Sequence, residues 1–193
     1  VLYRNNADAH DVRRLLGIYG IPYKDFSKKN ILKDADIQKL FYLLRAVHDP
    51  ADNEAMAKVL FIDFLGFDVF DIQRILQKSR NARGDYNKAI MTILEDSAKL
   101  VDAGIDKDRL DTYREFVTML KNQKRISEQT DAVSFFSDFV RESGFLKYIL
   151  GQSQSVLALQ KIEKLFDELK KESLARAPFS VADAMKYLDT MKQ

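Results

Sequence analysis

The stretch LFIDFLGFDVFDIQRIL, residues 60–76, is the most apolar segment of the chain. Its apolar side chains recur at helical spacing on both sides of Gly66, which separates the two patterns. Asp68 stands where its side-chain oxygen can cap the outgoing helix, in which Ile72, Ile75 and Leu76 share one face. The stretch therefore predicts a helix, a tight turn at Gly66 and a second helix.

The same helical spacing extends outward through almost the whole chain. Apolar residues at this spacing predict helices over residues 8–19, 34–49, 53–60, 68–76, 86–101, 107–122, 132–142, 156–172 and 181–191. Residues suited to beginning these helices are Asp34 or Asp36, Asp52 or Asn53, Asp106, and the capping box of Ser180 with Asp183. Residues suited to ending them are Gly20, Gly104 and Gly144. The sequence predicts a mainly α, multi-helix domain with a short extended segment at its N-terminus.

The length and composition support one sizeable domain, or one domain and part of another, and exclude several classes of site. The 193 residues are 46% hydrophobic, with only seven Gly, three Pro and no Cys. Without cysteine there are no disulfides, no thiolate metal ligands and no Cys nucleophile. No apolar run approaches the ~20 residues of a membrane span. We expect a soluble, cytoplasmic protein with no membrane partner.

Charge is distributed unevenly although the net charge is only +2. Residues 74–88 are basic, whereas residues 95–115 are rich in Asp and Glu. Solvated helix faces account for these segments more simply than a track for phosphates does.

Residue patterns typical of active sites are missing. No Gly precedes a Lys, as a phosphate-binding loop requires, and no Ser lies in a G-x-S-x-G turn. The two histidines, His10 and His48, lack the spacing of a zinc site. We interpret three aspartates near Gly66 as helix caps or exposed side chains rather than a cation site: Asp63, Asp68 and Asp71. We interpret four phenylalanines as core residues rather than a base-stacking platform: Phe135, Phe136, Phe139 and Phe145.

Several short segments follow one another in a recognisable order: VLYRNNA (1–7), GIPY (20–23), ILKDADI (31–37), DPADN (49–53), the turn at Gly66, FVRESGF (139–145), IEKL (162–165) and residues 179–188. Their order resembles part of the UvrD/Rep/PcrA-type superfamily I DNA helicases. The resemblance implies that residues 1–23 are the edge of the second RecA-like domain. It implies that residues 24–193 form the helical insertion called 2B.

The resemblance also implies a role in an ATP-driven motor, with ATP and Mg bound elsewhere in the parent helicase. This chain lacks the Walker elements, so we expect it to have no catalytic residues, cofactor or metal of its own. A DNA-stimulated ATPase activity of this chain alone would contradict that expectation.

The predicted DNA contacts follow from the same resemblance. Arg4 and Asn6 occupy positions near the single-strand track, and Gly66 lies in the turn whose amides approach duplex phosphate. The basic residues expected to bind fork or duplex DNA without reading its sequence are Lys28, Lys29, Lys33, Arg74, Lys78, Arg80 and Arg83.

Two alternatives remain open. The turn carries Asp68 where relatives of the UvrD type have glycine, and a carboxylate there repels phosphate. This favours a helical interaction or autoinhibitory module that docks on the rest of the helicase chain without touching DNA. A free-standing helical enzyme would require a pocket of converging polar groups.

Overall fold

A computed structural model describes residues 15–16, 18–21, 31–80 and 90–192, and all its named elements are helices. The α-helices are α2 (Ala35–His48), α3 (Asn53–Leu60), α4 (Val69–Arg80), α5 (Ile90–Leu94), α6 (Ser97–Asp102), α7 (Leu110–Ser127), α8 (Ala132–Glu142), α9 (Phe145–Leu150), α10 (Ser155–Ala175) and α11 (Val181–Lys192). Short 3-10 helices are η1 (Ile31–Lys33), η2 (Asp63–Leu65) and η3 (Lys107–Arg109). The predicted mainly α, multi-helix fold is confirmed over the described residues.

The chain divides into two units, residues 1–30 and residues 31–193. The predicted extended segment lies outside the described residues, as does most of the predicted first helix. The predicted boundary between residues 23 and 24 falls there too and stays a prediction. All the named helices belong to the second unit.

Aspartate side chains accept hydrogen bonds from the first turns of five of the described helices, and one of them is the predicted cap Asp68 at the start of α4. Asp34, Asp52, Asp96 and Asp131 each accept hydrogen bonds from two backbone N–H groups of the first turn that follows. The first N–H groups of a helix have no carbonyl partner inside the helix. A side-chain oxygen of the residue that precedes the helix accepts their hydrogen bonds and stabilises its N-terminal end. Asp34 and Asp52, rather than Asp36 and Asn53, are therefore the caps.

The last helix begins with the predicted capping box. The Ser180 hydroxyl accepts a hydrogen bond from the N–H of Asp183 at 3.2 Å, and the Asp183 carboxylate accepts one from the N–H of Ser180 at 3.2 Å. The predicted ends at Gly104 and Gly144 are also confirmed, with φ of +89° and +79°.

Two predicted helices were wrong in extent, and one short helix was not predicted. The predicted helix over 86–101 is interrupted, because Asp96 adopts extended backbone and caps a new helix, α6. The predicted helix over 107–122 starts as η3 and continues as α7 to Ser127, and the side chain of Asp106 does not cap it. The short helix α9 was not predicted; it buries Phe145 and Ile149.

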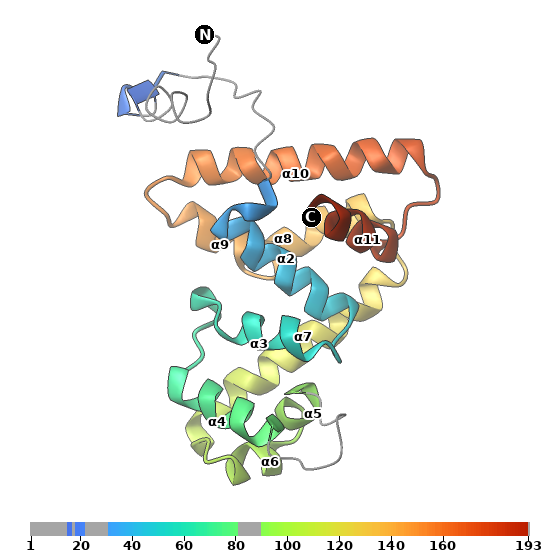
Figure 1. Ribbon diagram of the computed structural model, residues 1–193. Coiled ribbons are helices and arrows are strands. Elements are labelled where there is room, and N and C mark those ends of the chain that lie inside the picture. Colours follow the sequence, from blue (N-terminus) through green and yellow to red (C-terminus); the bar gives the residue numbers. More distant parts are fainter. Residues whose placement is uncertain (1–14, 17, 22–30, 81–89, 193) are drawn as a thin grey trace. The chain divides into compact units, whose positions relative to one another are not determined.

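Helix α2 is the central element of this unit (Figure 1). It packs against α3, α7, α10 and α11, while α10 also lies against α8 and α9. Helices α4, α5 and α6 gather near the first part of α7, with α5 in contact with α3, α4, α6 and α7. The long helix α7 thus contacts two groups of helices: the group around α2, and the group formed by α4, α5 and α6.

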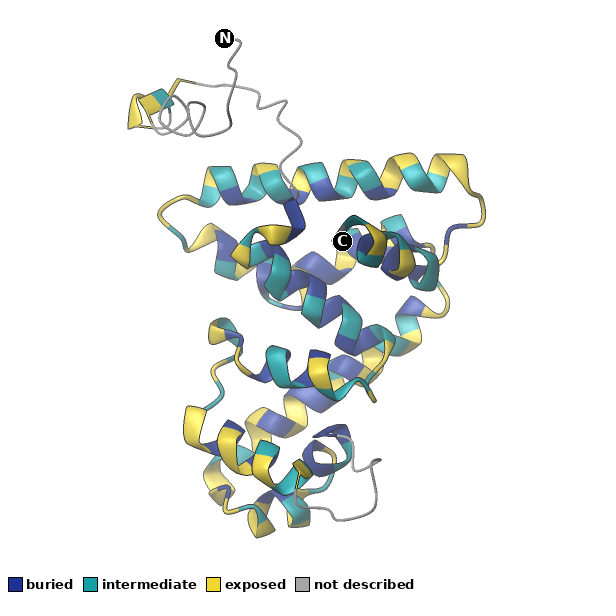
Figure 2. Cartoon of the chain, viewed as in Figure 1, coloured by how far each residue is buried: buried dark blue, intermediate teal, exposed yellow. Residues whose placement is uncertain are grey.

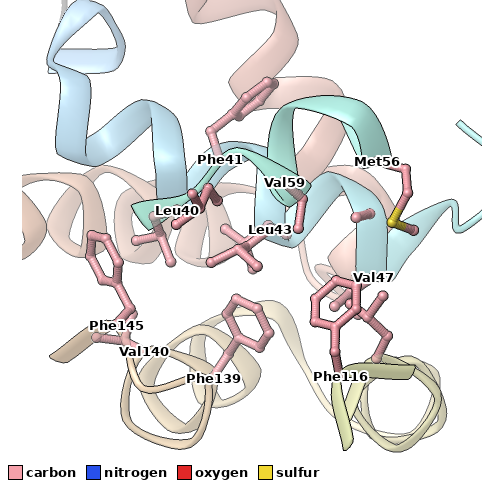
Figure 3. Packing of buried hydrophobic residues seen from close by; sticks show 14 of the residues in the cluster. Leu40, Phe41, Leu43, Val47, Met56, Val59, Phe116, Phe139, Val140 and Phe145 are labelled. Carbon is pink, nitrogen blue, oxygen red and sulfur yellow. The ribbon is translucent and has the colours of Figure 1, made fainter. Parts of the chain in front are cut away.

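One hydrophobic cluster connects all of these helices. Leu40 and Leu43 of α2 face Phe139 of α8, and all three side chains are fully buried (Figure 3). The four phenylalanines interpreted as core residues are each at most 3% exposed, which confirms that interpretation. Buried residues run along the inner faces of the helices and exposed residues along the outer faces (Figure 2).

Candidate nucleic-acid interface

The predicted turn between two helices is present at Gly66. Helix α3 ends at Leu60, η2 follows, and Gly66 adopts the left-handed conformation with φ of +72° before α4 begins. A Cβ atom at Gly66 would meet nothing within 4 Å. Glycine is therefore favoured there by the backbone conformation rather than by lack of space.

Backbone N–H groups around this turn already have partners within the chain. Asp63 accepts a hydrogen bond from the N–H of Phe64 at 3.0 Å, and its carbonyl accepts one from the N–H of Gly66 at 3.2 Å. Asp68 accepts hydrogen bonds from the N–H groups of Phe70 and Asp71 at 2.9 and 3.1 Å. A phosphate at this turn would have to displace the Asp63 carbonyl from the N–H of Gly66, and the carboxylates of Asp63 and Asp68 from the other donors.

Asp71 is fully buried, so the expectation of an exposed or capping side chain was wrong for this residue. Its carboxylate lies 3.0 Å from the guanidinium of Arg109 and 3.5 Å from that of Arg74, and accepts a hydrogen bond from the Tyr113 hydroxyl at 3.4 Å. One oxygen, Oδ1, accepts no hydrogen bond from a described residue. Burial raises the pKa of Asp71, with Arg109 opposing the shift.

On the other side of the turn, Asp63 belongs to a polar network with residues of α2 and α9. The Lys39 ammonium donates to both Asp63 oxygens at 3.0 Å and to the Tyr148 hydroxyl. Tyr148 in turn donates to Asp36 at 3.3 Å. Partial burial lowers the pKa of Lys39, but the hydrogen bonds to Tyr148 and Asp63 outweigh it and raise that pKa.

Two of the predicted DNA-binding cations contact α6 and the turn that follows it. Arg74 donates to the carbonyl oxygen of Gly104 at 2.7 Å. Lys78 donates to the carbonyl oxygen of Lys99 at 3.0 Å and pairs with Asp102. The Lys99 carbonyl also accepts a hydrogen bond from the N–H of Ala103 at 2.9 Å, so Lys78 is a second donor to it. Both cations lie at the negative end of the α6 dipole, where positive charge is stabilising.

Lys33 and Arg80 differ from those two cations. Both side chains are exposed, and neither makes an ion pair with another residue of the ranges 31–80 and 90–192. The other predicted contacts, Arg4, Asn6, Lys28, Lys29 and Arg83, lie outside the described residues. Of the predicted DNA contacts that the structure describes, Gly66 lies in the turn, Arg74, Lys78 and Arg80 lie on α4, and Lys33 lies on η1.

The surface beside the turn is partly apolar. Phe61 is 53% exposed, and Val69 and Phe70 at the start of α4 are 54% and 70% exposed. Figure 2 shows exposed residues along α4. Sequence reasoning missed the roles of Lys39, Tyr148 and Arg109, because their partners lie far away in the sequence and no local pattern indicates such pairs.

Other classes of site find no support in the described part of the chain. It holds no group of three or more His, Cys, Asp or Glu side chains that could bind a metal ion. None of its helices is both long and apolar enough to span a membrane. His48 lies at the end of α2, where its carbonyl oxygen accepts a hydrogen bond from Lys124 at 2.7 Å.

Comparison with known proteins finds a distant relative among helicase proteins. No protein-family model matches the chain. Over 160 residues the chain is 22% identical to an ATP-dependent helicase/nuclease subunit of Levilactobacillus brevis. The match covers 83% of this chain and 12% of that protein, so the chain spans a small part of its relative's length. The chain is thus similar to a segment of a helicase-related protein.

Proposed function

We propose that this chain is an accessory helical segment, of the 2B type, of an ATP-dependent superfamily I DNA helicase. The observation that carries the proposal is the similarity to a helicase/nuclease protein over 83% of the chain. The order of the family-like segments and the all-helical fold of the described residues agree with it. In this role the chain contacts or gates duplex DNA and leaves ATP and Mg to the rest of the longer protein.

DNA contact would be electrostatic and independent of base sequence. Lysine and arginine side chains that neutralise phosphates release condensed counterions, which gives affinity that falls with salt. Lys33 and Arg80 are exposed, and neither makes an ion pair with another described residue. Arg74 is already engaged with the carbonyl of Gly104, and Lys78 with α6. The N–H groups of Gly66, Phe70 and Asp71 already donate to oxygen atoms of Asp63 and Asp68. We therefore assign the described part of the DNA contact to Lys33 and Arg80.

A binding titration with forked DNA tests this assignment. We expect the affinity of the chain to fall between about 50 and about 200 mM salt. The charge reversals Lys33→Glu and Arg80→Glu should each weaken binding and flatten the salt dependence, because each removes a phosphate contact. Lys186→Glu on α11 is the matched control, since it changes the net charge equally at another exposed position. Equal losses in all three variants, or binding that ignores salt, would overturn the assignment.

A second candidate function is docking on the rest of the helicase chain without DNA contact. The exposed side chains of Phe61, Val69 and Phe70 favour it, because large apolar side chains are frequent at protein interfaces. Phe70→Ser should then weaken association with the remaining helicase chain and leave any DNA affinity unchanged. A loss of DNA affinity with association intact would count against docking.

A further inference from the structure

The turn at Gly66 has a symmetric sequence, D-F-L-G-F-D over residues 63–68. Each half contains one carboxylate and one phenyl ring, with Leu65 and Gly66 between the halves. The structure gives both halves the same kind of partners, a tyrosine and a cation, but on different elements.

The first half reaches α2 and α9. The ring of Phe64 stacks on that of Tyr148 with 4.9 Å between centroids and 26° between planes. Asp63 accepts hydrogen bonds from Lys39 at 3.0 Å, and its carboxylate lies 3.4 Å from the Tyr148 hydroxyl oxygen. The Lys39 ammonium also lies 4.5 Å from the centroid of the Tyr148 ring.

The second half reaches η3 and α7. The ring of Phe67 stacks on that of Tyr113 with 5.0 Å between centroids and 11° between planes, and meets Phe116 edge-on at 5.1 Å. The Asp68 carboxylate lies 3.5 Å from the guanidinium of Arg109. Arg109 also pairs with the buried Asp71, the acceptor of the Tyr113 hydroxyl.

The elements held by the two halves pack in different places. Helix α9 lies against α8 and α10, whereas η3 lies against α7. The turn that joins the halves is short and internally bonded: the N–H of Leu65 donates to the carbonyl of Ile62 at 3.1 Å, and that of Gly66 to the carbonyl of Asp63 at 3.2 Å. A closed turn of this kind has few backbone conformations through which to absorb a shift of one half.

We propose that residues 63–68 act as a brace that couples the position of α9 to that of η3 and the first turns of α7. The contacts of each half hold the turn in place and so position the other half. Loss of one half therefore weakens the contacts of the other, although Phe64 and Phe67 stack on different tyrosines. This inference stands apart from the DNA role and holds whichever of the two proposed functions is right.

A double-mutant cycle on the whole chain tests the brace. The equilibrium constant of unfolding in urea is measured for Phe64→Leu, Phe67→Leu and the double variant, with far-UV circular dichroism as the signal. If the halves depend on each other, either single substitution already removes much of the stability that the brace contributes. The unfolding equilibrium constant of the double variant should then be about fivefold smaller than the value obtained by multiplying the two single effects.

The control cycle pairs Phe67→Leu with Phe166→Leu. Phe166 is also a partly buried phenylalanine, but it lies on α10 against Phe136 of α8. A deviation at the turn that exceeds the control deviation, in the stated direction, supports the brace. A deviation no larger than the control's, or one of opposite sign, overturns it.

A gentler pair keeps the test available if a leucine variant does not fold. Tyr148→Phe and Tyr113→Phe each remove one hydroxyl and leave the stacked ring in place. The same criterion applies to their double variant.

Hydrogen exchange gives a second readout of the coupling. Tyr113→Phe should reduce amide protection in α9. Reduced protection confined to α4, η3 and α7 would contradict the coupling.

Discussion

At the scale of single residues, two carboxylates near the Gly66 turn have pKa values displaced in opposite directions. Burial raises the pKa of Asp63, but the hydrogen bond and charge of Lys39 outweigh it, and the pKa falls below 3.8. Burial also raises the pKa of Asp71, and there Arg109 does not cancel the effect. The two residues must therefore contribute to stability with opposite dependence on pH.

Asp71→Asn should change how stability depends on pH in a defined direction. The folded protein binds a proton at Asp71 more tightly than the unfolded chain does, because the folded pKa lies above 3.8. The wild type should therefore gain stability relative to the variant as the pH falls from about 7 to about 4. Urea unfolding of both proteins across this range measures the difference. A wild type that instead loses relative stability would mean that Arg109 lowers the pKa of Asp71.

Asp63→Asn is the matched control with the opposite sign. The folded pKa of Asp63 is lowered, so its contribution is present above the ordinary value of 3.8 and is lost as the pH falls through the folded value. The wild type should lose stability relative to this variant below about pH 4. Because Asp63 is largely exposed, this difference should be small.

At the scale of elements, the end of α6 depends on a cation from another helix. Helix α6 has six residues, too few to be stable alone. The Lys78 ammonium from α4 is a second donor to the carbonyl of Lys99, beside the N–H of Ala103, and pairs with Asp102. These contacts connect α4 to α6, and the DNA contact expected of Lys78 stays a prediction.

Lys78→Met should destabilise the protein by about 0.5–1.5 kcal/mol, because it removes the hydrogen bond and the ion pair that connect α4 to α6. Arg80→Met on the same helix is the control, with an expected change within about 0.5 kcal/mol. Urea unfolding measures both values, and hydrogen exchange should place the loss of protection in α6. If the two substitutions cost the same, the contacts of Lys78 do not stabilise α6.

Helix ends could be predicted from the sequence where the signal is local. Asp34, Asp52 and the Ser180 box mark where α2, α3 and α11 begin, and Gly144 marks the turn after α8. The break at Asp96 was missed because the apolar spacing continues across it. The burial of Asp71 was missed because it depends on Arg109 and Tyr113, which lie far away in the sequence.

The candidate site was less predictable than the helices. Basic residues could be found by composition, but their partners could not. Arg74 and Gly104 are thirty positions apart in the numbering, and Lys39 and Tyr148 more than a hundred. Such pairs form only when the helices pack, so the sequence did not separate the engaged cation Lys78 from Arg80, which makes no ion pair with a described residue.

At the scale of the whole molecule, one continuous core should make residues 31–193 unfold as a unit. The buried cluster takes residues from each of the named α-helices, and Leu43 of α2 lies within it with no exposed surface (Figure 3). Because the helices share one core, no group of them can leave without exposing the others.

Leu43→Ala should therefore lower the free energy of unfolding by about 2–5 kcal/mol and still leave a single transition. Its methyl groups are lost from the centre of the packing, and the surrounding helices can only partly fill the space. Leu174→Ala on α10 is the control, because that side chain is 82% exposed and its loss should cost less than about 0.5 kcal/mol. Calorimetry and circular dichroism measure both, and equality of the calorimetric and van't Hoff enthalpies tests for one transition. Two transitions in the Leu43→Ala variant would show that the groups of helices around α2 and around α4 unfold separately.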